Sequence, residues 1–144
     1  MILIVDSGST KTDWIAINEK GDKLFETQTL GLNPQVLGKY ILQERIVNNY
    51  ELYKFRKEVN QIYFYGAGCG TEPPRVLIKT VFSDIFKNCS KFSVKEDTYA
   101  AIYSTAKPNT KSIVFGIHTY VVNKKNLNKQ QISSLKEFNF KKKN

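Results

Sequence analysis

Residues 2–13 constrain the fold of this chain more than any other stretch. An apolar run without alternation precedes Asp6, and such a run suits a strand that is buried on both faces. Small and hydroxyl-bearing residues follow, and the strand pattern returns at Trp14. We therefore expect a strand at about residues 2–6, a tight connection, and a second strand at about residues 13–18.

The connection between these two strands carries the groups that grip phosphate. Successive loop N–H groups can point at one anion, and hydroxyl and ammonium groups can bind its oxygens. These groups belong to Ser7, Gly8, Ser9, Thr10, Lys11 and Thr12. Gly8 is expected to turn with positive φ, so that the backbone approaches the ligand closely. Asp6 could hold Mg²⁺, directly or through water, because Mg²⁺ prefers one or two carboxylates together with substrate phosphates.

Local chemistry also allows a plainer interpretation of this connection. Glycine, serine and threonine are common in turns, so residues 7–12 could form an ordinary hairpin turn. A Walker A loop is excluded, because the G-x-x-x-x-G-K-[ST] spacing and a following helix pattern are both absent.

A family resemblance rests on residues 6–13, which read DSGSTKTD. This stretch resembles the first phosphate loop of the actin-like ATPase and sugar kinase superfamily, and most closely that of the N-acetylglucosamine kinases and the BadF/BadG-type ATPases. The resemblance implies a loop that joins the first two strands of an N-terminal lobe and holds ATP, with Asp6 serving Mg²⁺. It also implies a sugar substrate, N-acetylglucosamine or a related hexose, and a homodimer among complete family members.

The rest of the sequence predicts an α/β fold. A third strand, after a turn at Gly21, would complete an antiparallel meander. The expected elements are a strand at about 23–31, a helix at 34–57 with an interruption at Asn48-Asn49, a strand at 62–65, a helix at 73–88, a strand at 91–94, a helix at 98–106 and a strand at 112–115. This order predicts a mixed sheet, with a β-meander followed by αβαβαβ. The resemblance implies the same order, that of a single ribonuclease-H-like (actin-like ATPase) lobe.

Asp97 is the candidate catalytic base. Open α/β sheets gather ligand-binding groups at the carboxyl ends of their strands, and Asp97 follows the strand at 91–94. Its surroundings resemble the family segment in which an aspartate accepts the proton of the attacking sugar hydroxyl. The alternative is a helix N-cap, a position that aspartate favours, and Glu96 is the second candidate for the base.

Two further segments are candidate substrate contacts. Asn33 follows the third strand, where the family places an asparagine against sugar hydroxyls, and its amide can both donate and accept. It could equally cap a helix that begins at Pro34. The glycine-rich stretch at 66–71 resembles the substrate-side loop of the family, with Gly68 and Cys69 as lining residues, and its alternative is a plain turn. Cys69 has no neighbour in the sequence that would activate it as a nucleophile.

Composition argues against nucleic-acid and membrane partners. The net charge is +9, but residues 1–105 carry 13 Lys+Arg against 12 Asp+Glu, whereas residues 106–144 carry 9 lysines and one acid. The body therefore lacks the basic stripe that a nucleic-acid footprint requires. No signal peptide or membrane span is visible, so Cys69 and Cys89 are expected to be free thiols of a cytoplasmic protein.

The resemblance ends at about residue 114. The expected division is a lobe at 1–114 and a basic, Lys/Asn-rich tail at 115–144, in which the second glycine loop of the family is missing and His118 has no triad context. We hypothesise a frameshifted or degenerate ending, which the other reading frames of the DNA would test. A genuine tail that binds acidic partners is the alternative.

An isolated lobe is expected to have little or no kinase activity, because the family transfers phosphate between two domains. Two other interpretations stay open. One is an activator ATPase of the benzoyl-CoA reductase type, for which Cys69 and Cys89 are poorly placed as iron–sulfur ligands. The other is a non-catalytic binding module that keeps the fold without turnover.

Overall fold

The computed structural model describes residues 1–105, 112–115 and 120–123 of the 144-residue chain. The chain divides into two compact units, Met1–Ala100 and Ala101–Asn144. The elements of the first unit are β1 Ile2–Ser7, β2 Lys11–Ile17, β3 Lys23–Leu30, α1 Lys39–Val47, α2 Tyr50–Phe55, β4 Gln61–Gly66, α3 Glu72–Ile85 and β5 Lys91–Glu96. Helix α4, Thr98–Thr105, runs across the boundary between the two units.

The first unit contains a five-stranded mixed sheet with the strand order β3-β2-β1-β4-β5. β1, β2 and β3 form the predicted antiparallel meander, and β4 pairs in parallel with both β1 and β5. The predictions of a mixed α/β sheet and of its first five strands are thus confirmed. The finer assignment to a ribonuclease-H-like lobe stays a prediction.

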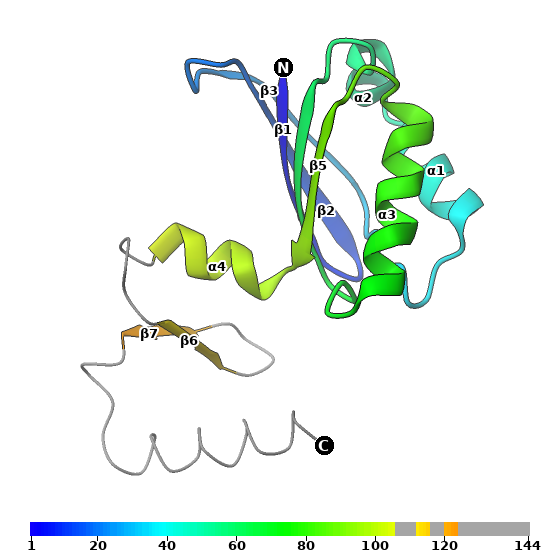
Figure 1. Cartoon of the computed structure of the whole chain (residues 1–144). Coiled ribbons are helices and arrows are strands. Elements are labelled where there is room, and N and C mark those ends of the chain that lie inside the picture. Colours follow the sequence, from blue (N-terminus) through cyan, green and yellow to red (C-terminus); the bar gives the residue numbers. More distant parts are fainter. Residues whose placement is uncertain (106–111, 116–119, 124–144) are drawn as a thin grey trace, which may run out of the picture. The chain divides into compact units, whose positions relative to one another are not determined.

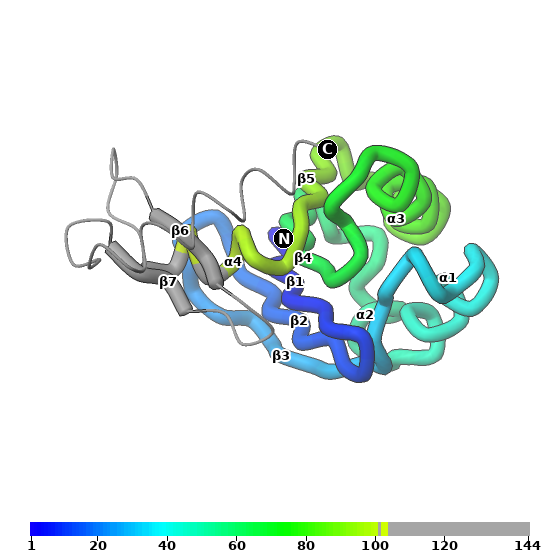
Figure 2. The backbone as a smooth tube through the Cα atoms, turned by 90° about the horizontal axis from the view of Figure 1, so that it is seen from below, coloured from blue at the N-terminus to red at the C-terminus, as the bar shows by residue number. Residues whose placement is uncertain are grey.

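Helices α1, α2 and α3 lie on one face of this sheet (Figure 1). Figure 2, turned by 90°, shows the same three helices together on one side of the strands. The residues of β1, β2 and β4 on this face are buried, whereas Ile4 and Ile15 on the opposite face are 37% and 39% exposed. The alternation in β1 therefore directs Leu3, Val5 and Ser7 toward the helices and Asp6 away from them.

The helix predicted at 34–57 is wrong in its start, whereas its predicted interruption is confirmed. Residues 34–36 form a turn, and α1 begins only at Lys39 with Gly38 as its N-cap. The chain then breaks as expected at Asn48-Asn49. The side chain of Asn49 caps α2 by accepting a hydrogen bond from the Leu52 N–H at 3.1 Å. Asn48 thus ends α1 as its C-cap, and Asn49 starts α2 as its N-cap.

Smaller corrections concern the ends of other elements. α3 ends at Ile85 rather than at residue 88, and β5 extends to Glu96 rather than to residue 94. The predicted end of the third helix at residue 106 lies outside the described residues.

The second unit contains a described hairpin. β6, Ser112–Phe115, pairs antiparallel with β7, Tyr120–Asn123, in a separate two-stranded sheet. The strand at 112–115 was predicted, but not this partner and not its separation from the main sheet. His118 and most of the predicted tail lie outside the described residues. The domain division at residue 114 stays a prediction.

No helix among the described residues is long and apolar enough to span a membrane.

An aromatic cluster joins α3 to the helix-covered face of the sheet. The ring of Phe82 lies 5.4 Å from that of Phe64, 6.2 Å from that of Trp14 and 6.4 Å from that of Phe92, between ring centroids. Phe82, Trp14 and Phe64 are completely buried, and the Trp14 indole donates a hydrogen bond to Thr29 Oγ1 at 3.0 Å. Phe82 is therefore the contact through which α3 holds β2, β4 and β5 together.

Phe82→Ala is expected to lower the free energy of unfolding by about 3–5 kcal/mol, because it opens a cavity that several rings line. Val76→Ala on the exposed side of the same helix is the control, with an expected change within about 0.5 kcal/mol. Urea unfolding followed by circular dichroism measures both. Equal losses in the two variants would contradict the role given to Phe82.

Candidate functional site

Several strand ends meet at one edge of the five-stranded sheet. β4 is parallel to β1 and β5, and β3 has the direction of β1 because β2 is antiparallel to both. Ser7 pairs with Gly66, and Gly66 pairs with Glu96, so the segments that follow these strands are neighbours. This edge gathers the hairpin loop (residues 8–10), the segment after β3 (residues 31–33), the glycine loop (residues 66–71) and Asp97.

A buried pair of hydroxyls connects the two ends of the hairpin loop. Ser7 Oγ and Thr12 Oγ1 are 2.8 Å apart, and both residues are fully buried. Ser7 Oγ accepts a hydrogen bond from the Leu32 N–H at 3.1 Å, and Thr12 Oγ1 donates to the Leu30 carbonyl at 3.2 Å. A phosphate contact by the Thr12 side chain stays a prediction, and the burial of its hydroxyl argues against it.

Gly31 lies directly against the hairpin loop. Its N–H donates to the Thr10 carbonyl at 2.9 Å. A Cβ at this position would overlap the Ser9 carbonyl and would lie 2.6 Å from the Gly8 carbonyl. Only glycine therefore fits beneath the loop here. Sequence reasoning used Gly31 merely as a strand end, and its contact with a distant loop left no signal in the local pattern.

The hairpin loop turns without the expected positive φ at Gly8. Among the described glycines, only Gly21 and Gly68 have positive φ, at 88° and 81°. A hydrogen bond from the Gly8 N–H to the Lys11 carbonyl, at 2.9 Å, closes the turn instead. Ser9 and Thr10 are exposed at its tip, and none of the hydrogen bonds recorded among the described residues uses their N–H groups. These two free donors fit an anion.

Lys11 lies on the open face of the sheet rather than over the loop. Its ammonium group is 3.1 Å from Asp13 Oδ2, and the two side chains are 65% and 41% exposed. Gln28 donates a hydrogen bond to the other oxygen of Asp13. An exposed pair of this kind contributes little stability, so Lys11 can exchange Asp13 for a phosphate at small cost.

The carboxylate of Asp6 lies close enough to two other carboxylates to be affected by their charge. Asp6 pairs directly with Asp13 across β1 and β2. The pKa of Asp6 is raised, first by desolvation and then by the charges of Asp13 and Asp97, while Lys11 lowers it. Like charges placed opposite each other on neighbouring strands are destabilising, so this pair favours a cation. Asp13 was not singled out from the sequence, although strand alternation puts it on the face of Asp6.

The described residues contain no group of three or more potential ligands arranged to hold a metal ion. Mg²⁺ in nucleotide sites uses one or two protein carboxylates and takes its other ligands from phosphates and water. The donor set of Asp6 and Asp13 fits that pattern.

Asn33 connects the hairpin loop to the glycine loop. Its Nδ2 donates to Ser9 Oγ at 3.3 Å, and its Oδ1 lies where a Cβ on Gly68 would be. Its Oδ1 also accepts a hydrogen bond from the Gln35 N–H at 3.0 Å, which closes a local turn. The predicted role of Asn33 and Pro34 as a helix start is therefore wrong, because α1 begins at Lys39.

Asp97 lies at the junction between β5 and α4. Its N–H donates to the Gly66 carbonyl at 3.2 Å, and its Oδ1 accepts a hydrogen bond from the Thr98 N–H at 2.8 Å. The side chain is half-buried and thus remains accessible to a ligand. The hydrogen bond to the Thr98 N–H and a catalytic role are compatible, because a carboxylate has two oxygens. The fallback residue Glu96 lies close to Gly70 instead, with Oε1 3.4 Å from where a Cβ would be.

Cys69 lies beneath the glycine loop and is fully buried. Burial raises the pKa of its thiol to about 11, with further increases from Asp97 and Glu96 and an opposing effect of Arg75. The thiol is therefore protonated at neutral pH and is not a nucleophile. A direct sugar contact by Cys69 stays a prediction, and its burial argues against it.

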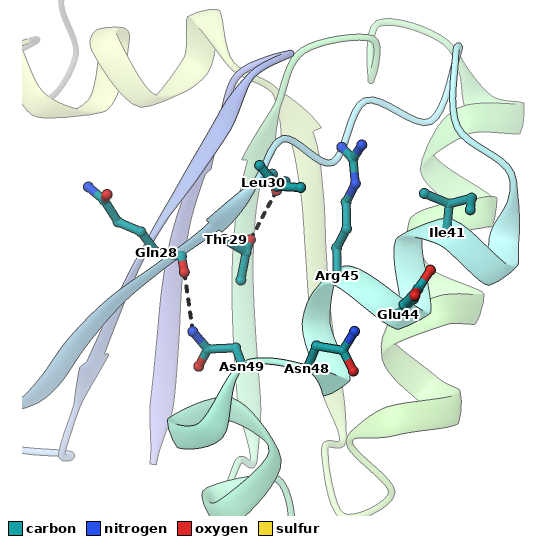
Figure 3. Close-up of a pocket in the computed structure, with 8 residues that line it drawn as sticks. All are labelled: Gln28, Thr29, Leu30, Ile41, Glu44, Arg45, Asn48 and Asn49. Carbon is teal, nitrogen blue, oxygen red and sulfur yellow. Dashed lines mark hydrogen bonds between the residues drawn. The ribbon is translucent and has the colours of Figure 1, made fainter.

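A separate groove of about 440 Å³ lies between β3 and α1 (Figure 3). Its lining residues are Gln28, Thr29, Leu30, Ile41, Glu44, Arg45, Asn48 and Asn49. Asn49 Nδ2 donates to the Gln28 carbonyl at 3.2 Å and so occupies part of the free edge of β3. Neither Asp6 nor Asp97 lines this groove.

No family model and no curated protein matches the sequence. Among solved structures, the chain is similar to the crystal structure of a proposed N-acetylglucosamine kinase from Porphyromonas gingivalis, with a TM-score of 0.63 and 24% sequence identity. The match covers 85% of this chain and 47% of that chain, so this chain spans about half the length of its structural neighbour. The likeness shows that the chain has a sugar-kinase-like fold.

Asp6→Asn is expected to raise the melting temperature at pH 7 in the absence of ligands. Because the folded-state pKa of Asp6 is raised, its ionisation makes folding less favourable as pH rises through the carboxyl range. The gain should vanish below about pH 3, where the carboxyl is protonated in both states.

Thermal unfolding at several pH values measures this gain. Glu19→Gln, which removes an exposed acid from the turn after β2, is the control for the change in net charge. A variant Asp6→Asn that melts below the wild type at pH 7 would show that the carboxylate is not strained.

Proposed function

We propose that residues 1–100 form the nucleotide- and sugar-binding lobe of an ATP-dependent sugar kinase, with N-acetylglucosamine as the favoured substrate. The observation that carries the proposal is the meeting of the hairpin loop, Asn33 and Asp97 at one edge of a sugar-kinase-like fold. The structural neighbour, itself a proposed N-acetylglucosamine kinase, supports the sugar class. Because the chain spans only about half the length of that neighbour, the activity of a complete kinase is proposed and does not follow from the match alone.

The hairpin loop would bind the phosphates of ATP. The exposed N–H groups of Ser9 and Thr10, their hydroxyls and the ammonium group of Lys11 supply donors to phosphate oxygens. Asp6 would hold Mg²⁺ with Asp13 nearby, and the ion would neutralise charge on the phosphates. Gly8 and Thr12 would act on the loop itself, Gly8 by closing the turn through its N–H and Thr12 through its buried hydroxyl.

Asp97 would act as the general base at the neighbouring strand end. It would accept the proton of the sugar hydroxyl as that oxygen bonds to the γ-phosphorus and the bond to the leaving ADP oxygen breaks. Asn33 and the backbone at Gly68 would orient the sugar hydroxyls, and Cys69 would shape the loop from inside. The shared contact of Asn33 with Ser9 and Gly68 would then link the nucleotide side of the site to its sugar side.

Ligand-induced changes in melting temperature test the proposal. Mg-ADP and N-acetylglucosamine should each raise the melting temperature of the chain, because a ligand that binds only the folded state stabilises it. Stabilisation by nucleotide alone would favour an activator-type ATPase. Stabilisation by neither ligand would reject the proposal in favour of a non-catalytic module.

Gly31→Ala is expected to lower the affinity for Mg-ADP at least about tenfold, a loss of about 1.4 kcal/mol, because the added methyl group displaces the Ser9 carbonyl. Gly38→Ala is the matched control, since a Cβ on Gly38 meets no atom within 4 Å. Isothermal titration calorimetry measures both affinities. Unchanged Mg-ADP affinity in Gly31→Ala would show that the hairpin loop is not part of the nucleotide site.

Asp97→Asn is expected to weaken N-acetylglucosamine binding about tenfold, because a hydrogen bond to a charged group contributes about 1.5–3 kcal/mol. Mg-ADP affinity should change less than about twofold, since hydrogen-bonding geometry at the start of α4 is preserved. Glu96→Gln serves as the control for loss of a neighbouring acid. Equal sugar affinity in Asp97→Asn and the wild type would remove Asp97 from the sugar site.

A further inference from the structure

Two arginines reach from the helical layer to the backbone of the candidate site. Arg45 on α1 donates from Nη1 to the Gly31 carbonyl. Figure 3 shows its side chain rising from α1 toward the segment that follows Leu30. Arg75 on α3 donates from Nε to the Cys69 carbonyl at 2.6 Å and from Nη2 to the Gly70 carbonyl at 3.0 Å. All three bonds go to backbone carbonyls of the chain, not to side chains of the candidate site.

The bond from Arg45 bears on the hairpin loop through Gly31. The Gly31 N–H holds the Thr10 carbonyl, and its α-carbon lies against Ser9. Gly31 is therefore fixed from two sides, by the loop at its N–H and by Arg45 at its carbonyl. Because Gly31 is buried, removing the arginine leaves a buried carbonyl without this donor, which is costly.

The two bonds from Arg75 act on the glycine loop in a different way. They hold two successive carbonyls with the planar fork of one guanidinium group, which lysine cannot reproduce. The Cys69 N–H donates to the Gly66 carbonyl at 3.2 Å, and the same carbonyl accepts from the Asp97 N–H at 3.2 Å. Arg75 therefore fixes the turn that contains Gly68. The Gly66 carbonyl at the base of this turn also holds the Asp97 N–H.

We propose that Arg45 and Arg75 are two independent positioning residues, Arg45 for the nucleotide side of the site and Arg75 for its sugar side. The assignment of sides rests on the proposed function, whereas the separate control of two loops rests on the contacts alone. Each loop is thus held by one helix of the layer that covers the sheet. A change in one arginine should loosen one loop and leave the other in place.

Amide hydrogen exchange tests the separate control without any ligand, because local opening sets the exchange rate of protected amides. Arg45→Met should raise exchange at the hydrogen-bonded amides of Gly8, Gly31 and Leu32 at least about tenfold, which corresponds to about 1.4 kcal/mol. Arg75→Met should do the same at the hydrogen-bonded amides of Ala67 and Cys69. Each variant should change the other loop less than about twofold, well below the tenfold that marks about 1.4 kcal/mol.

Arg56→Met is the matched control, because Arg56 donates to the Tyr53 carbonyl on α2, outside the candidate site. It should leave both loops unchanged. Conservative variants sharpen the test: Arg45→Lys should restore most of the protection because one bond is needed, and Arg75→Lys should not because two are needed. Protected amides in β1 and β4 verify that each variant is folded. Arg45→Ala and Arg75→Lys replace a methionine variant that does not fold.

Binding of Mg-ADP and N-acetylglucosamine tests the assignment of sides. Arg45→Met should weaken Mg-ADP binding at least about tenfold and spare the sugar, and Arg75→Met should do the reverse. Increased exchange in both loops with either variant, or in neither loop, would overturn the proposal. If each variant raises exchange only in its own loop but the wild-type chain binds neither ligand, the two positioning residues are supported. The proposed function is then rejected instead.

Discussion

The hydroxyl of Ser7 is the contact on which the candidate site depends. It is fully buried at the end of β1, lies against the Thr12 hydroxyl at the start of β2, and accepts the N–H of Leu32 after β3. One oxygen thus joins both ends of the hairpin loop to a segment 25 residues further along the chain. Gly31 can then pack against Ser9, and Asn33 can reach both Ser9 and Gly68. A serine in a phosphate-type loop is used here to build the loop, not to bind a ligand.

The carboxylates at the same edge destabilise the fold, whereas the Ser7 hydroxyl stabilises it. Asp6 and Asp13 face each other across two strands, and the pKa of Asp6 is raised by burial and by two neighbouring acids. A sheet gains no stability from this arrangement. Strain of this kind is common where stability is given up for binding. The Asp6 carboxylate lies at the same edge as the N–H groups of Ser9 and Thr10, which no hydrogen bond among the described residues uses. A site for a cation and its anionic partner requires this combination.

The sequence predicted the parts of the site that depend on local patterning. The strands, the meander and the strand-end positions of Asp6 and Asp97 follow from apolar periodicity and turn residues. Contacts between distant segments were not predictable in this way. The packing of Gly31 and the burial of Cys69 and Thr12 all depend on tertiary neighbours. The family resemblance named Asn33, but its contact with two loops appears only once β1, β3 and β4 are assembled.

The most direct test of the account is the response of individual backbone amides to Mg-ADP. Two-dimensional NMR spectra of the ¹⁵N-labelled chain would report every assigned N–H during a titration. The account predicts that the amide signals of Ser9 and Thr10 shift most, with smaller shifts at Gly31 and Leu32 beneath the loop. No shift at saturating Mg-ADP, or shifts centred on the groove around Asn48 and Asn49, would contradict it.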